Sequence, residues 1–148
     1  MPQPFEPKRQ NRFLVNLPVE FDLPAWTIHT TSRPKIDLRK EGYFSFTDFV
    51  LTFRDPTSPS TTQRLWNIFL AFSGIEYAPE FVKNNLDKFK DGFNYSLEMC
   101  DPTGAVVERW QMCKCRIIDI DFGSVTYSED SLAECKITIR AEEVYLDF

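Results

Sequence analysis

Apolar and polar residues alternate along the C-terminal third of the chain. The clearest run is Leu132 to Ala141, in which every second residue from Ala133 onwards is apolar and the residues between are polar or charged. Successive side chains of a β-strand point to opposite faces, so this pattern predicts a strand with one buried face and one wet face. Shorter runs of the same kind are separated by residues typical of turns. They are Tyr95–Cys100, Val106–Met112 and Cys115–Gly123, with a type I turn at Asp101–Gly104.

The N-terminal half contains further predicted strands and an extended arm. Residues 1–10 are rich in Pro and polar residues, which predicts an arm ahead of a single domain formed by residues 11–148. The predicted strands are Arg12–Leu17, Trp26–Thr30 and Tyr43–Arg54, and in the last of these Phe49, Leu51 and Phe53 share one face.

One helix is predicted at Ser60–Ser73. Ser60 and Gln63 have the spacing of a capping box, and Gly74 is suited to end the helix. Its apolar face consists of Leu65, Ile68, Phe69 and Phe72. A weaker pattern between Glu76 and Asp91 favours a second helix, with Phe81, Val82, Leu86 and Phe89 facing inward.

The residues alone therefore predict one mainly β domain of antiparallel strands with one flanking α-helix. A chain of 148 residues with 43% hydrophobic residues can bury a single sizeable core. Its abundant aromatic side chains, fourteen of them Phe, suit the pleated, half-buried surface of a sheet.

Charge and hydropathy exclude several classes of protein. The net charge of −5 argues against tight binding of nucleic acid, which needs clustered Lys and Arg. We find no apolar run of the ~18 residues that a membrane span requires and no secretory leader at the N-terminus. We therefore expect the chain to stay in the cytoplasm where it is made, with its four cysteines as reduced thiols.

The residue types that carry catalysis do not form a recognisable set. His29 is the single histidine, and a strand histidine at a surface or interface explains it better than a catalytic triad does. Asp119 and Asp121 lie on one strand face and could be half of an acid–base or metal site, but a solvated strand face explains them better. Cys113 and Cys115 have a spacing that differs from that of a zinc knuckle. We therefore predict that the chain is not an enzyme and holds no metal or cofactor.

Aromatic residues are candidates for the core or for an interface between subunits, because aromatic side chains are enriched at both. The strands also supply more alternating surface than one small core needs. The aromatic candidates are Trp26, Phe49, Phe53, Trp110 and Phe122.

The order of several motifs resembles the tail-tube protein family of contractile-tail bacteriophages, which is related to baseplate tube-initiator proteins and to type VI secretion tube proteins. The family has a strand-borne Trp, a short polar link, an I-x-x-I-D-F-G strand, a Tyr/Ser-acidic turn and a final alternating strand. These correspond here to Trp110, Cys113–Arg116, Ile117–Gly123, Tyr127–Ser131 and Leu132–Ala141. The N-terminal half matches as well, at Asn11-Arg12-Phe13, Leu23-Pro24-Ala25-Trp26, Arg33-Pro34 and the Asp101–Gly104 turn.

The resemblance implies an antiparallel β-barrel of two packed sheets that assembles into a hexameric ring. Such rings stack into the inner tail tube, a virion structural element through which DNA is ejected after the surrounding sheath contracts. The implied partners are copies of the chain, the tail sheath, and baseplate or tail-terminator proteins; DNA crosses the lumen without tight binding. The implied location is the virion tail, assembled in the host cytoplasm. A baseplate or tail-terminating adaptor of the same fold remains an alternative, as does a small β-barrel ligand-binding module or enzyme.

Two groups of residues are candidates for contacts in such an assembly. The polar faces of the C-terminal strands would face a net negative lumen. Their residues are Asp119, Asp121, Glu134, Lys136, Thr138 and Arg140. A basic loop from Arg33 to Gly42 contrasts with the acidic chain and would contact the next ring through Arg33, Lys35, Arg39 and Lys40.

Overall fold

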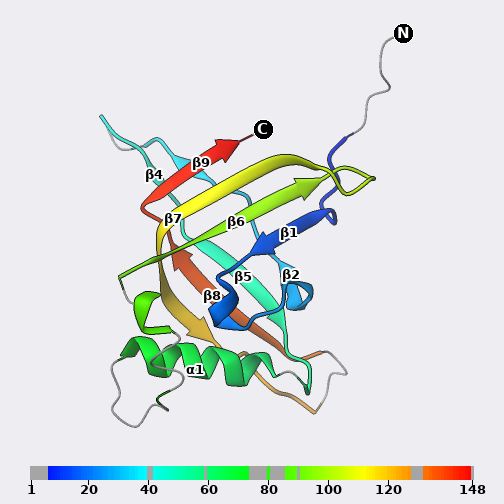
Figure 1. Ribbon diagram of the computed structural model, residues 1–148, viewed down its shortest axis with the longest axis vertical. Coiled ribbons are helices and arrows are strands. Elements are labelled where there is room, and N and C mark those ends of the chain that lie inside the picture. The colour runs from blue at the N-terminus through cyan, green and yellow to red at the C-terminus, as the bar shows by residue number, and fades with distance from the viewer. Residues whose placement is uncertain are drawn as a thin grey trace.

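The computed structural model describes residues 7–39, 42–58, 60–73, 80, 86–89, 91–127 and 132–147. Among these residues, short strands predominate in the N-terminal half, and longer strands follow one long α-helix (Figure 1). The strands are β1 (Phe13–Asn16), β2 (Ile28–Thr30), β3 (Ile36–Asp37), β4 (Ser45–Phe46), β5 (Phe49–Arg54), β6 (Phe93–Cys100), β7 (Val106–Asp121), β8 (Glu134–Arg140) and β9 (Glu143–Asp147). The helices are α1 (Thr61–Ser73) and the 3₁₀ turns η1 (Val19–Phe21), η2 (Ala25–Thr27) and η3 (Asp87–Phe89).

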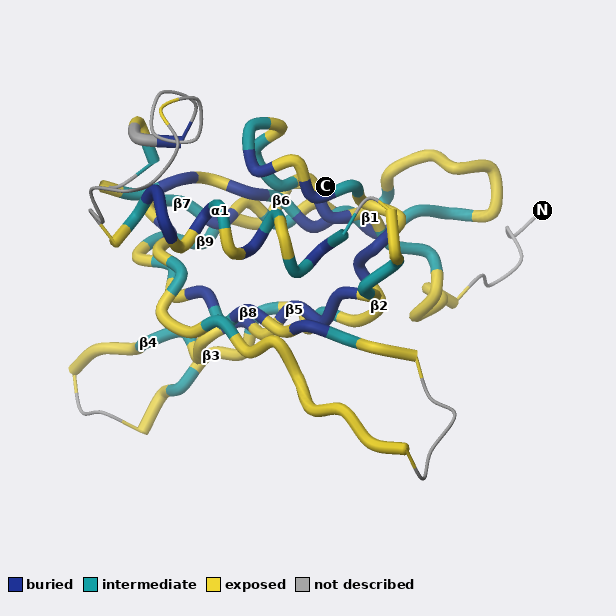
Figure 2. Tube along the Cα trace, turned by 90° about the horizontal axis from the view of Figure 1, so that it is seen from below, coloured by how far each residue is buried: buried dark blue, intermediate teal, exposed yellow. Residues whose placement is uncertain are grey.

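Strand β7 belongs to two layers. Seven strands form one antiparallel sheet in the order β1-β6-β7-β8-β5-β2, with β9 also beside β7. The first half of β7 pairs with β6 and β9, whereas its second half pairs with β8. The sheet therefore folds over into a β6 layer (β1, β6, β9 and the first half of β7) and a β8 layer (β2, β5, β8 and the second half of β7). Figure 2 shows the two layers edge-on, with buried residues between them.

The fold-over lies at Lys114. Its backbone has φ +53°, a left-handed conformation that residues other than glycine rarely adopt. The Lys114 N–H donates a hydrogen bond to Asn94 Oδ1 at 3.1 Å. Strands β8 and β9 follow β7 through the bend, because Cys113 lies opposite Glu143 on one side of it and Arg116 lies opposite Arg140 on the other. Strand β7 and the β8–β9 segment beside it thus carry the sheet from one layer into the next.

The core fills the space between the layers and extends under α1. Phe49, Leu51 and Phe53 of β5 are at most 1% exposed and face the β6 layer, as their alternation predicts. Phe21 joins the core to the helix side, since its ring makes edge-on contacts with Phe72, Phe89 and Phe93. The core is continuous from the sheets to the helix.

Helix α1 confirms the predicted helix. Ser60 Oγ accepts a hydrogen bond from the Gln63 backbone at 3.2 Å, as an N-cap serine does. Leu65 and Ile68 are fully buried, whereas Phe69 on the same predicted face stays 37% exposed. The apolar face is thus partly uncovered.

Several predicted boundaries are wrong. The run from Trp26 begins as the 3₁₀ turn η2, and only Ile28–Thr30 form a strand. The loop at 33–42 contains β3, which pairs with β4 in a separate hairpin. The polar link at 113–116 lies inside β7, because the chain keeps its pairing through the bend. Strand β9 was not expected. The region from 76 to 91 lies mostly outside the described residues, although Leu86 is buried and Phe89 half-buried, as predicted.

Gly123, the glycine of the I-x-x-I-D-F-G motif, should tolerate no side chain. It has φ +79°, and an added Cβ would lie 2.5 Å from the carbonyl oxygen of Glu134. Gly104 has a similar φ of +89° but open space around it. Gly104→Ala should therefore lower the free energy of unfolding by about 1–2 kcal/mol, the cost of a left-handed residue. Gly123→Ala should cost about 1–3 kcal/mol more, because the backbone must shift. Equal losses for the two variants in urea unfolding would contradict this assignment.

Candidate functional site

The outward face of the β8 layer brings the predicted polar residues together. Residues directly opposite each other in an antiparallel pair share a face. Asp119 lies opposite Thr138, and Asp121 lies opposite Lys136, which in turn lies opposite Thr52 of β5. All six polar candidates therefore lie on one face, which we call the charged face. Its members in the described strands are Val50, Thr52, Arg54, Arg116, Asp119, Asp121, Glu134, Lys136, Thr138 and Arg140.

The charged face is balanced rather than negative. The strand register adds Arg54 and Arg116 to the candidates found from the sequence, because they lie opposite Glu134 and Arg140. The face then has four basic side chains and three acidic ones, and Asp48 beside Arg140 provides a fourth. Single-strand alternation could not reveal this balance, which depends on the pairing of three strands.

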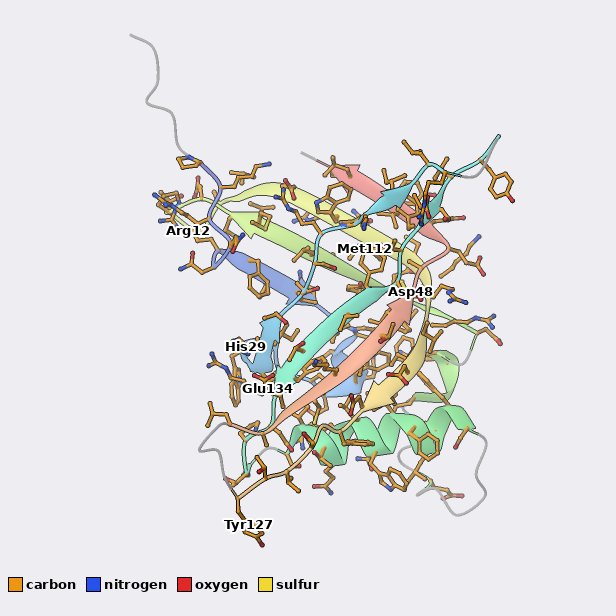
Figure 3. All side chains as sticks on the ribbon, turned by 180° about the vertical axis from the view of Figure 1, so that it is seen from behind. Arg12, His29, Asp48, Met112, Tyr127 and Glu134 are labelled. Atoms are coloured by element: carbon orange, nitrogen blue, oxygen red, sulfur yellow. The ribbon has the colours of Figure 1, made fainter. Side chains whose placement is uncertain are left out.

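Contacts between polar side chains link this face at both ends of β8. His29 Nδ1 lies 2.9 Å from Glu134 Oε1, and Arg140 Nε donates to Asp48 Oδ1 at 3.1 Å. In Figure 3, His29 and Glu134 lie together at one end of the strand and Asp48 at the other. The Asp48 carboxylate raises the pKa of Arg140 above its ordinary value, mainly through this hydrogen bond. The sole histidine is therefore part of a surface pair, as its position in the sequence suggested.

The basic loop forms a hairpin that projects beyond the β8 layer. Strands β3 and β4 extend away from the charged face at one end, and the chain around Tyr127 lies at the opposite end (Figures 2 and 3). Arg39 binds Asp37 within the hairpin at 2.8 Å, and Arg33 reaches back to the β6 layer. Lys35 is exposed, and Lys40 lies outside the described residues. The hairpin also exposes apolar side chains, namely Ile36, Leu38, Tyr43 and Phe44.

The five aromatic candidates divide between the core and the surface. Phe49 and Phe53 are buried, and Trp110 packs partly against the core. Trp26 is 63% exposed and Phe122 is 40% exposed. Phe122 borders an open groove of about 490 Å³ between α1 and β7, together with Trp66, Phe69, Phe72 and Ile118.

Metal-ligating side chains and thiols are scattered through the described part of the chain. No group of three or more His, Cys, Asp or Glu among them is placed to hold a metal ion. Cys115 and Cys135 are buried, and Cys100 and Cys113 are half-buried thiols. In the described part of the chain, no helix is long and apolar enough to cross a membrane.

Comparison with known proteins identifies the fold. No protein-family model and no curated protein sequence matches the chain. A chain of the anti-feeding prophage cap, a tube-terminating cap, is 11% identical with a TM-score of 0.63, covering 99% of this chain and 95% of that one. A chain of the sheath/tube terminator of an extracellular contractile injection system is 13% identical with a TM-score of 0.62, covering 97% and 99%. A chain of the anti-feeding prophage baseplate, solved with 6-fold symmetry, is 12% identical with a TM-score of 0.55, covering 99% and 97%.

The fold is therefore that of proteins from the caps, terminators and baseplates of contractile injection systems. The resemblance found in the sequence motifs is confirmed at the level of the fold. The mainly β architecture of two packed layers with one flanking helix is confirmed as well.

The four thiols should differ in reactivity. Burial raises the pKa of Cys115 to about 12 and raises that of Cys135 as well, so both stay protonated at pH 8. Because the thiolate is the nucleophile, iodoacetamide should modify Cys100 and Cys113 at least about tenfold faster in the unassembled, folded chain. Peptide mass spectrometry measures each rate. Modification of Cys115 as fast as Cys113 would contradict the buried position of Cys115.

Proposed function

We propose that this protein is a structural, non-enzymatic subunit of the inner tube of a contractile tail, which closes into hexameric rings that stack. The observation that carries the proposal is the two-faced β8 layer: one face packs in the core, and the other presents polar and charged side chains from three paired strands, with an open hollow of about 640 Å³ at one end beside Asp121, Glu134 and Lys136. A surface of this kind suits the wall of a wet channel better than it suits an active site.

The edges of the β8 layer support ring closure. In the described chain, β2 has a strand partner on one side, and residues 116–121 of β7 pair with β8 on one side alone. An unpaired strand edge can be completed by a neighbour, and a repeated contact that closes leaves no edge. Sheet pairing or close sheet packing between copies would place the charged face towards the lumen.

The charge balance of this face suits a channel for DNA. A mixture of basic and acidic side chains, with one directly opposed pair of cations at Arg116 and Arg140, gives a phosphate backbone few sites at which several cations act together. The lumen-facing candidates are those predicted from the sequence, with Arg54 and Arg116 added. A near-neutral lining replaces the net negative lining that the sequence suggested.

Stacking would use the projecting β3–β4 hairpin. Lys35 and Arg39 are exposed there, so they remain candidates for contacts with the next ring, as does Lys40. Arg33 instead forms an ion pair with Glu108 of the same chain. The exposed apolar side chains of the hairpin add area that a neighbour would cover.

A tube terminator or baseplate adaptor is the second candidate. Its support is that chains of the cap and terminator structures match this chain over almost their whole length, at TM-scores of 0.63 and 0.62. Both candidates have the same expected partners, which are copies of the chain, the tail sheath, and baseplate or terminator proteins. Both also place the protein in a phage or phage-like tail, after assembly in the host cytoplasm.

Electron microscopy of the purified protein tests the proposal. A tube subunit should form sixfold rings that stack into tubes, because its two ring faces bind each other. An adaptor should form single rings and require a second protein on one face. A chain that stays monomeric at high concentration, alone and with sheath and baseplate proteins, would rule out both roles.

The hairpin contact makes a narrower prediction. Lys35→Glu should shorten or abolish stacks while single rings persist, and high salt should weaken stacking of the wild type. Arg9→Glu makes the same charge change on the exposed N-terminal arm and should leave stacking intact. Sedimentation and microscopy measure stack length. Equal stack lengths in the two variants would remove Lys35 from the contact.

A further inference from the structure

Glu108 occupies a core-facing position of β7. It lies opposite the buried Met99, and the next pair on this face is Trp110 with the buried Leu97. The Glu108 side chain is 5% exposed. A carboxylate at such a position is costly unless it is paired and fully hydrogen-bonded. Strand alternation alone would place an apolar residue here.

Two cations from separate segments neutralise this carboxylate. Lys8 Nζ lies 2.6 Å from Oε1, and Arg33 Nη1 lies 3.2 Å from Oε1 and 3.4 Å from Oε2. Trp110 Nε1 donates to Oε2 at 2.6 Å. Burial raises the pKa of Glu108, but the hydrogen bonds from Lys8 and Trp110 and the charges of Arg33 and Lys8 outweigh it and leave the pKa below its ordinary value. Glu108 is therefore ionised at neutral pH.

The two cations come from two different segments that lead away from the layers. Lys8 lies in the N-terminal arm, five residues before β1. Arg33 lies three residues before β3, at the root of the projecting hairpin. The nearby bond from Thr47 N–H to Lys35 O closes the hairpin on itself rather than onto the layers. The Arg33–Glu108 pair, in contrast, ties the root of the hairpin to β7.

We propose that Glu108 is a positioning residue that anchors the N-terminal arm and the root of the β3–β4 hairpin to the same point of the β6 layer. This anchor fixes the direction in which the hairpin projects. If the protein stacks as proposed above, Glu108 sets the place at which the hairpin meets the next ring, without touching that ring. The part of the inference that concerns stacking rests on the proposed function, whereas the anchor itself does not.

Hydrogen exchange of the unassembled protein tests the anchor. Glu108→Gln keeps an acceptor for Trp110 but removes the charge that holds both cations. Amide exchange should accelerate by about tenfold or more at residues 8–12 and 31–35, since a hydrogen bond to a charged group is strong. Exchange in β5 and β8 should stay unchanged, which separates local release from global loss of stability.

Single variants separate the two ties. Lys8→Ala should accelerate exchange in the arm alone, and Arg33→Ala should accelerate it at the hairpin root alone. Glu98→Gln is the matched control, because Glu98 lies on the outward face of the neighbouring strand and binds Asn16 and Arg109. If Glu108→Gln fails to fold, Glu108→Met provides an apolar side chain of similar size that suits the buried position. Unchanged exchange at 31–35 in the Glu108 and Arg33 variants would overturn the anchor.

Microscopy of the same variants distinguishes the two hypotheses. Released segments with intact single rings and shorter stacks would support both. If exchange shows that the segments are released, but neither the wild type nor any variant forms rings, the anchor is supported and the proposed assembly role is refuted. Normal rings and stacks with unchanged exchange would refute the anchor alone.

Discussion

The bend in β7 is the constraint on which the rest of the structure depends. A single strand of 16 residues runs through both layers, and the β8–β9 segment stays paired with it through the bend, with a register shift between Ile117 and Asp119. The pairing therefore fixes how the layers sit relative to each other without a separate connecting loop. Lys114 takes the unfavourable backbone conformation at the bend, and Asn94 and Glu143 hold its N–H and its ammonium group. Because of this fold-over, one side of the β8 layer packs in the core, and the other side is the charged face.

Charge is used in two different ways on the two layers. On the β8 layer, basic and acidic side chains are mixed across exposed strands, where each pair of opposite charges contributes little stability because water screens it. Their value is a surface that is polar and ordered but nearly neutral. On the β6 layer, the buried carboxylate of Glu108 binds both Lys8 and Arg33. A buried carboxylate that loses its cationic partners destabilises the fold. The exposed charges thus define a surface, and the buried charge fixes the positions of segments.

The sequence predicted the parts of the fold that depend on local periodicity. The buried side chains of β5 and β8 follow directly from alternation, and all six polar candidates lie on one face. Helical spacing found the buried Leu65 and Ile68 of α1, but it missed the buried Leu70 and Ala71 and wrongly placed Phe69 on the buried side. Periodicity could not show that residues 113–116 continue a strand. The strand bends at Lys114, whose backbone is left-handed, and in the sequence this bend has the same polar residues as a loop between two strands. Alternation with Trp110 and Met112 places Glu108 on the core-facing side of its strand, but it could not find the cations that neutralise the carboxylate. Nor could periodicity place Arg54 and Arg116 on the charged face. Those assignments depend on the pairing of residues far apart in the chain, which only the register reveals.

The central claim is that the charged face of the β8 layer lines the channel of a ring. An electron cryo-microscopy map of the assembled protein, fitted with this fold, tests it most directly. The account predicts that β5, β8 and the second half of β7 face the ring axis, with Lys136 and Thr138 pointing into the lumen. A map in which α1 or the β6 layer faces the axis, with the charged face on the outer surface, would contradict it.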